Sequence, residues 1–169
     1  MELTNKSTLF ISVIDGHKGI IHKIANAYAK NAENKKDLTQ EIVLQLWKAF
    51  DRYNPQFKYS TWIYKVALNV SLAYYRKENN RVRVFNPLQE DIVSLAVPDD
   101  PGEREADFHH LQQFIAELKD LDRAILLLYL EEKSQKEMAE IMGITETNIS
   151  TRIGRIKSTL RQKFSQLPK

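Results

Sequence analysis

The feature that most constrains the fold is a set of helix-ending and helix-starting residues near the C-terminal end. Ser134 and Glu137 have the spacing of a capping box, in which a hydroxyl and a carboxylate each satisfy a free amide of a helix's first turn. Gly143 can take the left-handed conformation that ends a helix, and Thr145 can cap the next one. The sequence therefore predicts a short helix, a tight turn, and a second helix over residues 146–164.

These two helices have the form of a helix-turn-helix over residues 135–156. Ala139 is small enough for the helices to cross closely, and Ile144 and Ile149 are apolar anchors for the second helix. The second helix is basic beyond its first turn. Short polar side chains that can read base edges are followed by cations that can hold phosphates, namely Asn148, Ser150, Thr151, Arg152, Arg155 and Lys157. The pattern favours DNA binding, and the alternative is a plain helical hairpin with a solvated basic face.

The rest of the chain is also expected to be helical, so the predicted fold class is all-α. Five Gly and five Pro in 169 residues, beside many Leu, Ile, Ala, Lys, Glu and Gln, favour helices over a turn-rich sheet. The chain has no Cys, which excludes disulfides and thiolate metal sites and indicates a reducing compartment. We expect a cytoplasmic protein without a leader or membrane span, without a cofactor or metal, and without a small-molecule substrate.

Charge and proline divide the chain into two small helical domains joined by a flexible acidic linker. Residues 1–82 hold 13 Lys and Arg against 7 Asp and Glu, whereas residues 83–110 hold 2 against 7. Pro87, Pro98, Pro101 and Gly102 fall in this acidic stretch, where apolar residues show no sustained period. The predicted boundaries are an N-terminal domain at 1–82, a linker at 83–107 and a C-terminal domain at 108–169.

Apolar periodicity predicts three or four helices in the N-terminal domain, of which three are placed over residues 8–32, 38–53 and 61–79. Asp37 is expected to cap the second helix, whose buried stripe is Leu38, Ile42 and Leu46. The third helix is expected to bury Ile63, Val66, Ala67 and Val70. A polar and basic line on another face of that helix consists of Lys65, Asn69, Leu72 and Arg76. In the C-terminal domain, helices are expected over residues 108–118 and 121–130, the latter capped by Asp120.

Two blocks carry a resemblance to a known family. Residues 37–47 (DLTQEIVLQLW), 50–55 (FDRYNP) and 60–69 (STWIYKVALN) resemble the core-binding and promoter-melting region of the extracytoplasmic-function sigma factors. The C-terminal domain resembles that family's terminal domain at matching positions, which are Ser134, Glu137, Ala139, Gly143, Ile149, Arg152, Arg155, Leu160 and Arg161. Departures from the family pattern are Ala73, where an acid is common, and Ser150 and Gly154, where larger side chains are frequent.

The resemblance implies a sigma factor that directs RNA polymerase to promoters and helps to melt them. The N-terminal domain would act as sigma region 2 at the minus-ten element, and the C-terminal domain as sigma region 4 at the minus-thirty-five element. The implied partners are core RNA polymerase and promoter DNA, both duplex and single-stranded. An anti-sigma factor, tethered to the membrane, is a further hypothesis. The acidic linker would mimic nucleic acid within the polymerase, or it is an ordinary solvated linker.

Carried over by position, the resemblance also implies site residues. The helix face that docks on the polymerase clamp would be Asp37, Gln40, Glu41 and Leu44, although residue chemistry alone favours a solvated face with one exposed Leu. The loop that captures a flipped base would include Asn54, Gln56, Phe57, Lys58 and Tyr59, and either aromatic ring could be the stacking platform or could fill the core. Asn69 would help to open the duplex, and phosphates of the displaced strand would be held by Lys65, Arg76, Lys77 and Arg81.

Two other classes of protein compete with this interpretation. A stand-alone helix-turn-helix transcriptional regulator would bind duplex DNA without polymerase. An enzyme on a helical scaffold would need His17, His22, His109 and His110 as bases or ligands, and these histidines lack metal-ligand spacing. We therefore expect the protein not to be an enzyme.

Overall fold

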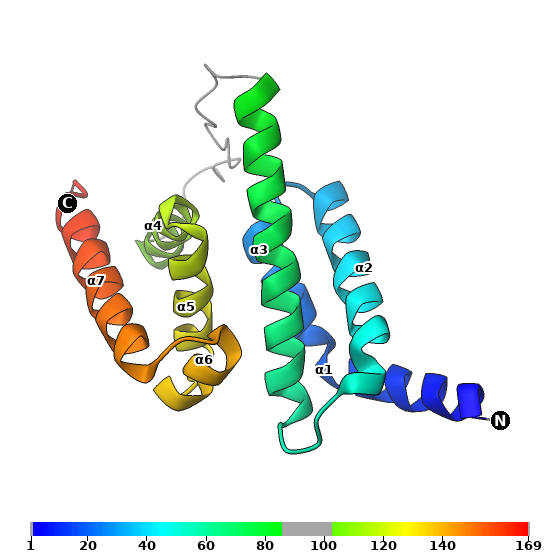
Figure 1. Cartoon of the computed structure of the whole chain (residues 1–169). Coiled ribbons are helices and arrows are strands. Elements are labelled where there is room, and N and C mark those ends of the chain that lie inside the picture. Colours follow the sequence, from blue (N-terminus) through cyan, green and yellow to red (C-terminus); the bar gives the residue numbers. More distant parts are fainter. Residues whose placement is uncertain (1, 86–102, 169) are drawn as a thin grey trace.

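The computed structural model describes residues 2–85 and 103–168, and every regular element in that part of the chain is helical (Figure 1). The all-α prediction is therefore confirmed. The elements are α1 (Glu2–Tyr28), α2 (Ala32–Ala49), a 3-10 turn η1 (Phe50–Arg52), α3 (Tyr59–Phe85), α4 (Glu103–Glu117), α5 (Asp120–Leu130), α6 (Gln135–Met142) and α7 (Glu146–Ser165). Side chains are described for residues 2–78 and 104–168.

The helices form two lobes. The first lobe comprises α1, α2, η1 and α3, and the second lobe comprises α4 to α7. Helices α3 and α4 extend into both ends of the predicted linker, residues 83–107, and the remainder of it, residues 86–102, lies outside the described residues. The proposed domain boundaries therefore remain a prediction. No helix within residues 2–85 or 103–168 has the length and apolar character needed to cross a bilayer.

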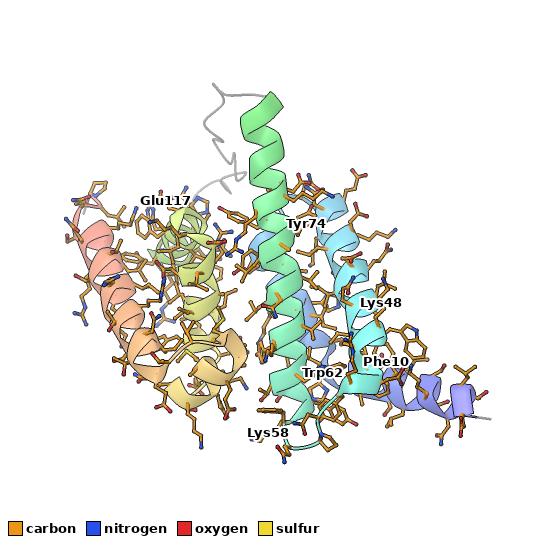
Figure 2. All side chains as sticks on the ribbon, viewed as in Figure 1. Phe10, Lys48, Lys58, Trp62, Tyr74 and Glu117 are labelled. Carbon is orange, nitrogen blue, oxygen red and sulfur yellow. The ribbon has the colours of Figure 1, made fainter. Side chains whose placement is uncertain are left out.

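The core of the first lobe lies between α1, α2 and α3. The predicted stripe of Leu38, Ile42 and Leu46 is confirmed, because all three side chains are fully buried. Phe10 of α1, labelled in Figure 2, lies near the C-terminal end of α2. Its ring is edge-on to that of Trp47, with centroids 5.1 Å apart. Edge-to-face aromatic pairs of this kind add about 0.5 to 1.5 kcal/mol beyond the burial of their surface. This packing fixes α1 against the end of α2 where the loop to α3 begins.

Helix α2 begins earlier than its sequence pattern suggested. The prediction that Asp37 caps this helix is wrong, because the N-cap is Asn31, whose side-chain oxygen accepts a hydrogen bond from the backbone of Asn34 at 2.8 Å. Asp37 lies inside the helix and is exposed. Both residue types are good N-caps, and the polar run before Leu38 carries no apolar periodicity that would have shown it to be helical.

Helix α3 is covered on two sides, by α1 and α2 and by α5 and α6 (Figure 1). Ile63 and Ala67 are buried as predicted, whereas Val66 and Val70 are only half-buried. Leu72, which was expected on a polar face, is buried. The prediction treated α3 as amphipathic with one buried stripe, but a helix packed by two sets of partners buries a wider part of its circumference.

The second lobe follows its predicted local signals closely. Ser134 and Glu137 form both hydrogen bonds of a capping box, and Gly143 ends α6 in the left-handed conformation with φ 69°. The hydroxyl of Thr145 accepts from the backbone of Asn148 at 3.1 Å and caps α7. Helix α5 differs slightly, because its N-cap is Lys119, without a side-chain cap, and Asp120 is its first residue.

Two glycines of the second lobe allow a matched test of backbone conformation. A Cβ at either Gly143 or Gly154 would meet no atom within 4 Å, but only Gly143 has positive φ. We expect Gly143→Ala to lower the free energy of unfolding by about 1 to 2 kcal/mol, because an L residue is strained there. Gly154→Ala should raise the free energy of unfolding by up to about 1 kcal/mol, because alanine has a higher helix propensity than glycine within α7. Urea unfolding followed by circular dichroism measures both, and equal effects of the two variants would contradict this account.

Candidate nucleic-acid interface

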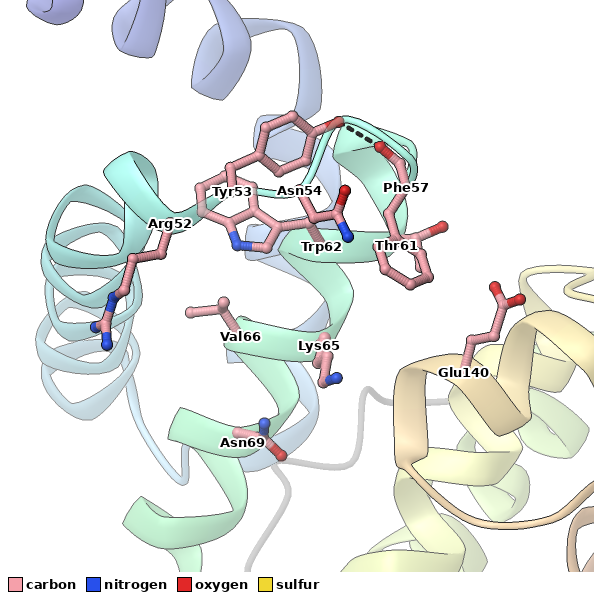
Figure 3. Close-up of a pocket in the computed structure, with 10 residues that line it drawn as sticks. All are labelled: Arg52, Tyr53, Asn54, Phe57, Thr61, Trp62, Lys65, Val66, Asn69 and Glu140. Atoms are coloured by element: carbon pink, nitrogen blue, oxygen red, sulfur yellow. Dashed lines mark hydrogen bonds between the residues drawn. The ribbon is translucent and has the colours of Figure 1, made fainter.

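A pocket of about 310 Å³ opens where the loop after η1 meets the first turns of α3 (Figure 3). Its volume lies near the lower end of the range of about 300 to 1,000 Å³ found for small-ligand pockets. Nine of its lining residues belong to the first lobe and one belongs to α6 of the second lobe; they are Arg52, Tyr53, Asn54, Phe57, Thr61, Trp62, Lys65, Val66, Asn69 and Glu140. The pocket thus combines aromatic rings, amides and cations, which are the groups that hold an unstacked base and its phosphate.

Tyr53 organises the loop beside this pocket. Its ring stacks on Tyr59 with centroids 4.5 Å apart and planes 18° from parallel, and it lies edge-on to Trp62 at 5.3 Å. Its hydroxyl donates a hydrogen bond to the carbonyl oxygen of Phe57 (Figure 3). Burial and the neighbouring Tyr59 raise the pKa of the Tyr53 hydroxyl above its usual value. The ring and hydroxyl together hold Phe57 at the pocket.

The structure separates the loop residues that the sequence grouped together. Asn54 and Phe57 line the pocket, and the Phe57 side chain remains 43% exposed. Tyr59 is half-buried against Tyr53 and fills space within the loop. Of the two aromatic candidates, Phe57 is therefore the one whose ring is exposed at the pocket. The exposed side chains of Gln56 and Lys58 do not line the pocket.

The start of α1 ties this region to the rest of the lobe. The ammonium of Lys6 forms an ion pair with Asp51 of η1 at 2.7 Å and lies 4.4 Å from the ring centroid of Trp47. The backbone of Gln56 donates to the side chain of Asn54 at 3.0 Å, which closes a tight turn within the loop. The first part of the loop is therefore held by specific polar contacts.

The predicted basic line on α3 divides into different environments. Lys65 and Asn69 are exposed and line the pocket, whereas Leu72 is buried. Arg76 forms an ion pair with Asp120 of α5 at 2.6 Å. Lys77 is exposed, and the side chain of Arg81 lies outside the described residues. Along this line, Leu72 is thus the buried position, and Arg76 is exposed but paired.

The outer face of α7 presents most of the predicted base-reading residues. Asn148, Ser150, Thr151 and Arg155 are exposed, while Ile149, Ile153 and Ile156 are buried beneath them. The remaining predicted contacts are cations with partners inside the lobe. Arg152 pairs with Asp122 at 2.9 Å and also donates to Asn148, and the ammonium of Lys157 lies 4.6 Å from the ring centroid of Tyr129.

The predicted polymerase-binding face also forms one continuous surface. Asp37, Gln40, Glu41 and Leu44 are all exposed on α2, on the side away from its buried stripe. Leu44 is 43% exposed, and Glu41 accepts a hydrogen bond from Gln45 at 2.8 Å. An exposed leucine beside acidic and amide groups can serve as the centre of a small protein contact.

Sequence reasoning missed Tyr53, and it favoured a core role for Trp62 over contact with DNA. Trp62 is half-buried and also lines the pocket. The aromatic run around Asn54-Pro55 was a usable signal for Tyr53. The histidines were the other candidates for chemistry. Within residues 2–85 and 103–168, no three His, Asp or Glu side chains are grouped as a metal site requires.

Comparison with known sequences matches both lobes. Residues 13–81 match the family described as Sigma-70 region 2, and residues 109–160 match the family described as Sigma-70, region 4. Together they define a DNA-binding transcription initiation factor.

Two relatives that match most of this chain are sigma factors. The chain is 25% identical over 171 residues to the ECF RNA polymerase sigma factor SigW of Bacillus subtilis, covering 94% of this chain and 90% of SigW. It is 26% identical to SigM of the same organism over 147 residues, covering 86% of this chain and 89% of SigM.

Two solved structures share the fold. CnrH, solved in complex with the cytosolic domain of CnrY, gives a TM-score of 0.67 at 17% identity, over 94% of this chain and 89% of CnrH. The sigma factor RpoE of Bartonella quintana, solved with the anti-sigma factor NepR, gives a TM-score of 0.70 at 17% identity. The match covers 96% of this chain and 98% of RpoE. The chain belongs to the extracytoplasmic-function sigma factors, which direct RNA polymerase to promoters.

The Tyr53 hydroxyl provides a test of how the loop is positioned. We expect Tyr53→Phe to lower the free energy of unfolding by about 0.5 to 1.5 kcal/mol, because it removes one hydrogen bond and keeps the ring packing. Trypsin should also cleave faster after Lys58, which is exposed in the loop. Tyr129→Phe is the control, because that ring lies on α5 away from the loop. Unchanged cleavage after Lys58 would show that the hydroxyl does not position the loop.

Proposed function

We propose that this sigma factor reads a promoter at two places, with the first lobe at the minus-ten element and the second lobe at the minus-thirty-five element. The observation that carries the proposal is the pocket beside Phe57, where an exposed ring, Asn54, Lys65 and Asn69 converge. An extruded base needs a stacking surface and hydrogen bonds to its edge, and the strand beside it needs cations for its phosphates. The pocket offers all of these groups within one short segment of chain.

The exposed residues of α7 support a separate role in duplex recognition. The amides and hydroxyls of Asn148, Ser150 and Thr151 lie in the first turns of α7, where a recognition helix meets base edges in the major groove. Arg155 follows them and would contact phosphate. Arg152 and Lys157 would have to leave their present partners before they could do the same.

The exposed face of α2 supports docking on core polymerase through Asp37, Gln40, Glu41 and Leu44. The protein would then act in the cytoplasm, where the polymerase is, and it would be a recognition subunit with no catalytic centre of its own. CnrH and RpoE were each solved in complex with a second protein, which for RpoE is the anti-sigma factor NepR, and this supports a protein inhibitor as a further partner of this chain. Membrane tethering of that inhibitor remains a hypothesis.

The pocket is tested by Phe57→Ala. Base stacking on an aromatic side chain contributes on the order of 1 to 3 kcal/mol, so we expect holoenzyme binding to a fork-junction probe to weaken by about 5- to 150-fold. The probe is selected by the wild-type holoenzyme from a pool randomised in the minus-ten segment. Phe108→Ala is the control, because Phe108 is 60% exposed on α4 and does not line the pocket. Equal affinities of the two variants would contradict base capture by Phe57.

The polymerase contact is tested by reversing charge on α2. Gln40→Lys combined with Glu41→Lys should weaken binding to core polymerase by at least about tenfold, because it places cations on the docking face. The fold should be unaffected, since both side chains are exposed. Asp15→Lys on α1 is the control for a general change of charge. Fluorescence anisotropy with labelled protein measures the affinity, and normal binding with normal run-off transcription would refute the proposed face.

A further inference from the structure

Arg52 is a cation of the base pocket that the sequence patterns did not indicate. It is the last residue of η1, its side chain is exposed, and it lines the pocket together with Lys65 of α3. Within the part of the chain that the structure describes, neither of these two side chains forms an ion pair or a hydrogen bond. A cation that is left unpaired on the wall of a pocket favours an anionic ligand there.

The 3-10 turn η1 separates its two charges between two hollows. Asp51 pairs with the ammonium of Lys6 at 2.7 Å and lines a second hollow beside the first turns of α1, but it does not line the base pocket. Successive side chains of a 3-10 turn point in directions about 120° apart, because such a turn has about three residues. The carboxylate next to Arg52 in the sequence therefore does not neutralise it at the base pocket.

The pocket wall between Arg52 and Lys65 is apolar. In Figure 3 the side chain of Val66 lies between those of Arg52 and Lys65. The carboxylate among the lining residues is that of Glu140 on α6, so the first lobe contributes no carboxylate to the pocket. One face of α3 supplies four lining residues at positions i, i+3, i+4 and i+7, which are Trp62, Lys65, Val66 and Asn69.

A flipped nucleotide has two charged neighbours that such a pocket must accommodate. The base leaves the stack, but its sugar stays joined to the strand through one phosphate on each side. Moving a phosphate from water onto an apolar surface is costly, so both phosphates must stay at the rim of the pocket. A guanidinium can bind phosphate through two parallel N–H donors, whereas an ammonium binds it as a point charge. Two cations on opposite sides of an apolar wall match this arrangement.

We infer that Arg52 and Lys65 form a two-phosphate site, in which each cation binds one of the two phosphates that flank the captured base. The inference rests on the proposed function, because it takes the pocket beside Phe57 as the place where the base is held. It adds Arg52 to the DNA contacts and gives Lys65 one particular phosphate. The strand then enters the pocket past one cation and leaves it past the other.

The salt dependence of binding tests the contact made by Arg52. With core polymerase in excess, Arg52→Gln should weaken binding to the selected fork-junction probe by about three- to tenfold, as expected for one hydrogen-bonded contact. The slope of log Kd against log salt concentration should fall by about 0.7, the value for one phosphate on a single strand. Arg52→Lys should restore the slope, because it keeps the charge.

Lys18→Gln is the matched control for this measurement. It removes the same charge from an exposed position on α1 that does not line the pocket. We expect the wild-type slope for this variant. An unchanged slope for Arg52→Gln, or an equal decrease for Lys18→Gln, would overturn the contact between Arg52 and phosphate.

Uncharged phosphates identify which contact each cation makes. Each phosphate of the minus-ten segment in the selected probe is replaced singly by a methylphosphonate. The wild-type holoenzyme should lose affinity at two successive phosphates, one on each side of the captured base. Arg52→Gln should be insensitive to replacement of one of these, and Lys65→Gln to replacement of the other. If both variants are insensitive at the same phosphate, or at phosphates that do not flank one nucleotide, the two-phosphate site is refuted.

Phe57→Ala, measured on the same probes, separates this inference from the proposed function. If Phe57→Ala weakens binding and Arg52→Gln responds to every methylphosphonate as the wild type does, the two-phosphate site fails while base capture stands. If Arg52 and Lys65 each match one phosphate but Phe57→Ala binds normally, base capture by Phe57 fails while the phosphate contacts stand.

Discussion

Helix α3 contacts both lobes, and the rest of the structure depends on which of its sides packs against which lobe. One side completes the core with α1 and α2, where Ile63 and Ala67 are fully buried. Another side meets α5 and α6, and its first turns form the pocket with the loop after η1. A rigid helix can hold a site to fractions of an ångström because its backbone hydrogen bonds are internal. The site is therefore set by the core of the first lobe, and one residue of its wall, Glu140, comes from the second lobe.

The local signals in the sequence were reliable wherever a helix end depends on residues next to one another. Ser134, Glu137, Gly143 and Thr145 all act as predicted, because caps and turns are decided by contacts within a few residues. The N-terminal end of α2 shows the limit of this reasoning. Asn31 and Asp37 are both suitable caps, and the choice between them depends on how α1 and α2 pack, which a local pattern does not contain.

The candidate site was predicted in part. The resemblance led to Asn54, Phe57, Lys65 and Asn69, which the structure brings together around one pocket. Tyr53 was missed because its contacts, the stack on Tyr59 and the hydrogen bond to Phe57, exist only once the loop is folded. Leu72 and Arg76 were placed on an open face because helical spacing describes one helix at a time. Their burial and pairing arise from a second lobe whose position no periodicity reveals.

The contact of Lys6 with Asp51 and Trp47 links two distant parts of the sequence. It couples the first turns of α1 to the 3-10 turn from which the pocket loop emerges. A substitution that removes the Lys6 ammonium would therefore act on the pocket loop, some fifty residues further along the sequence.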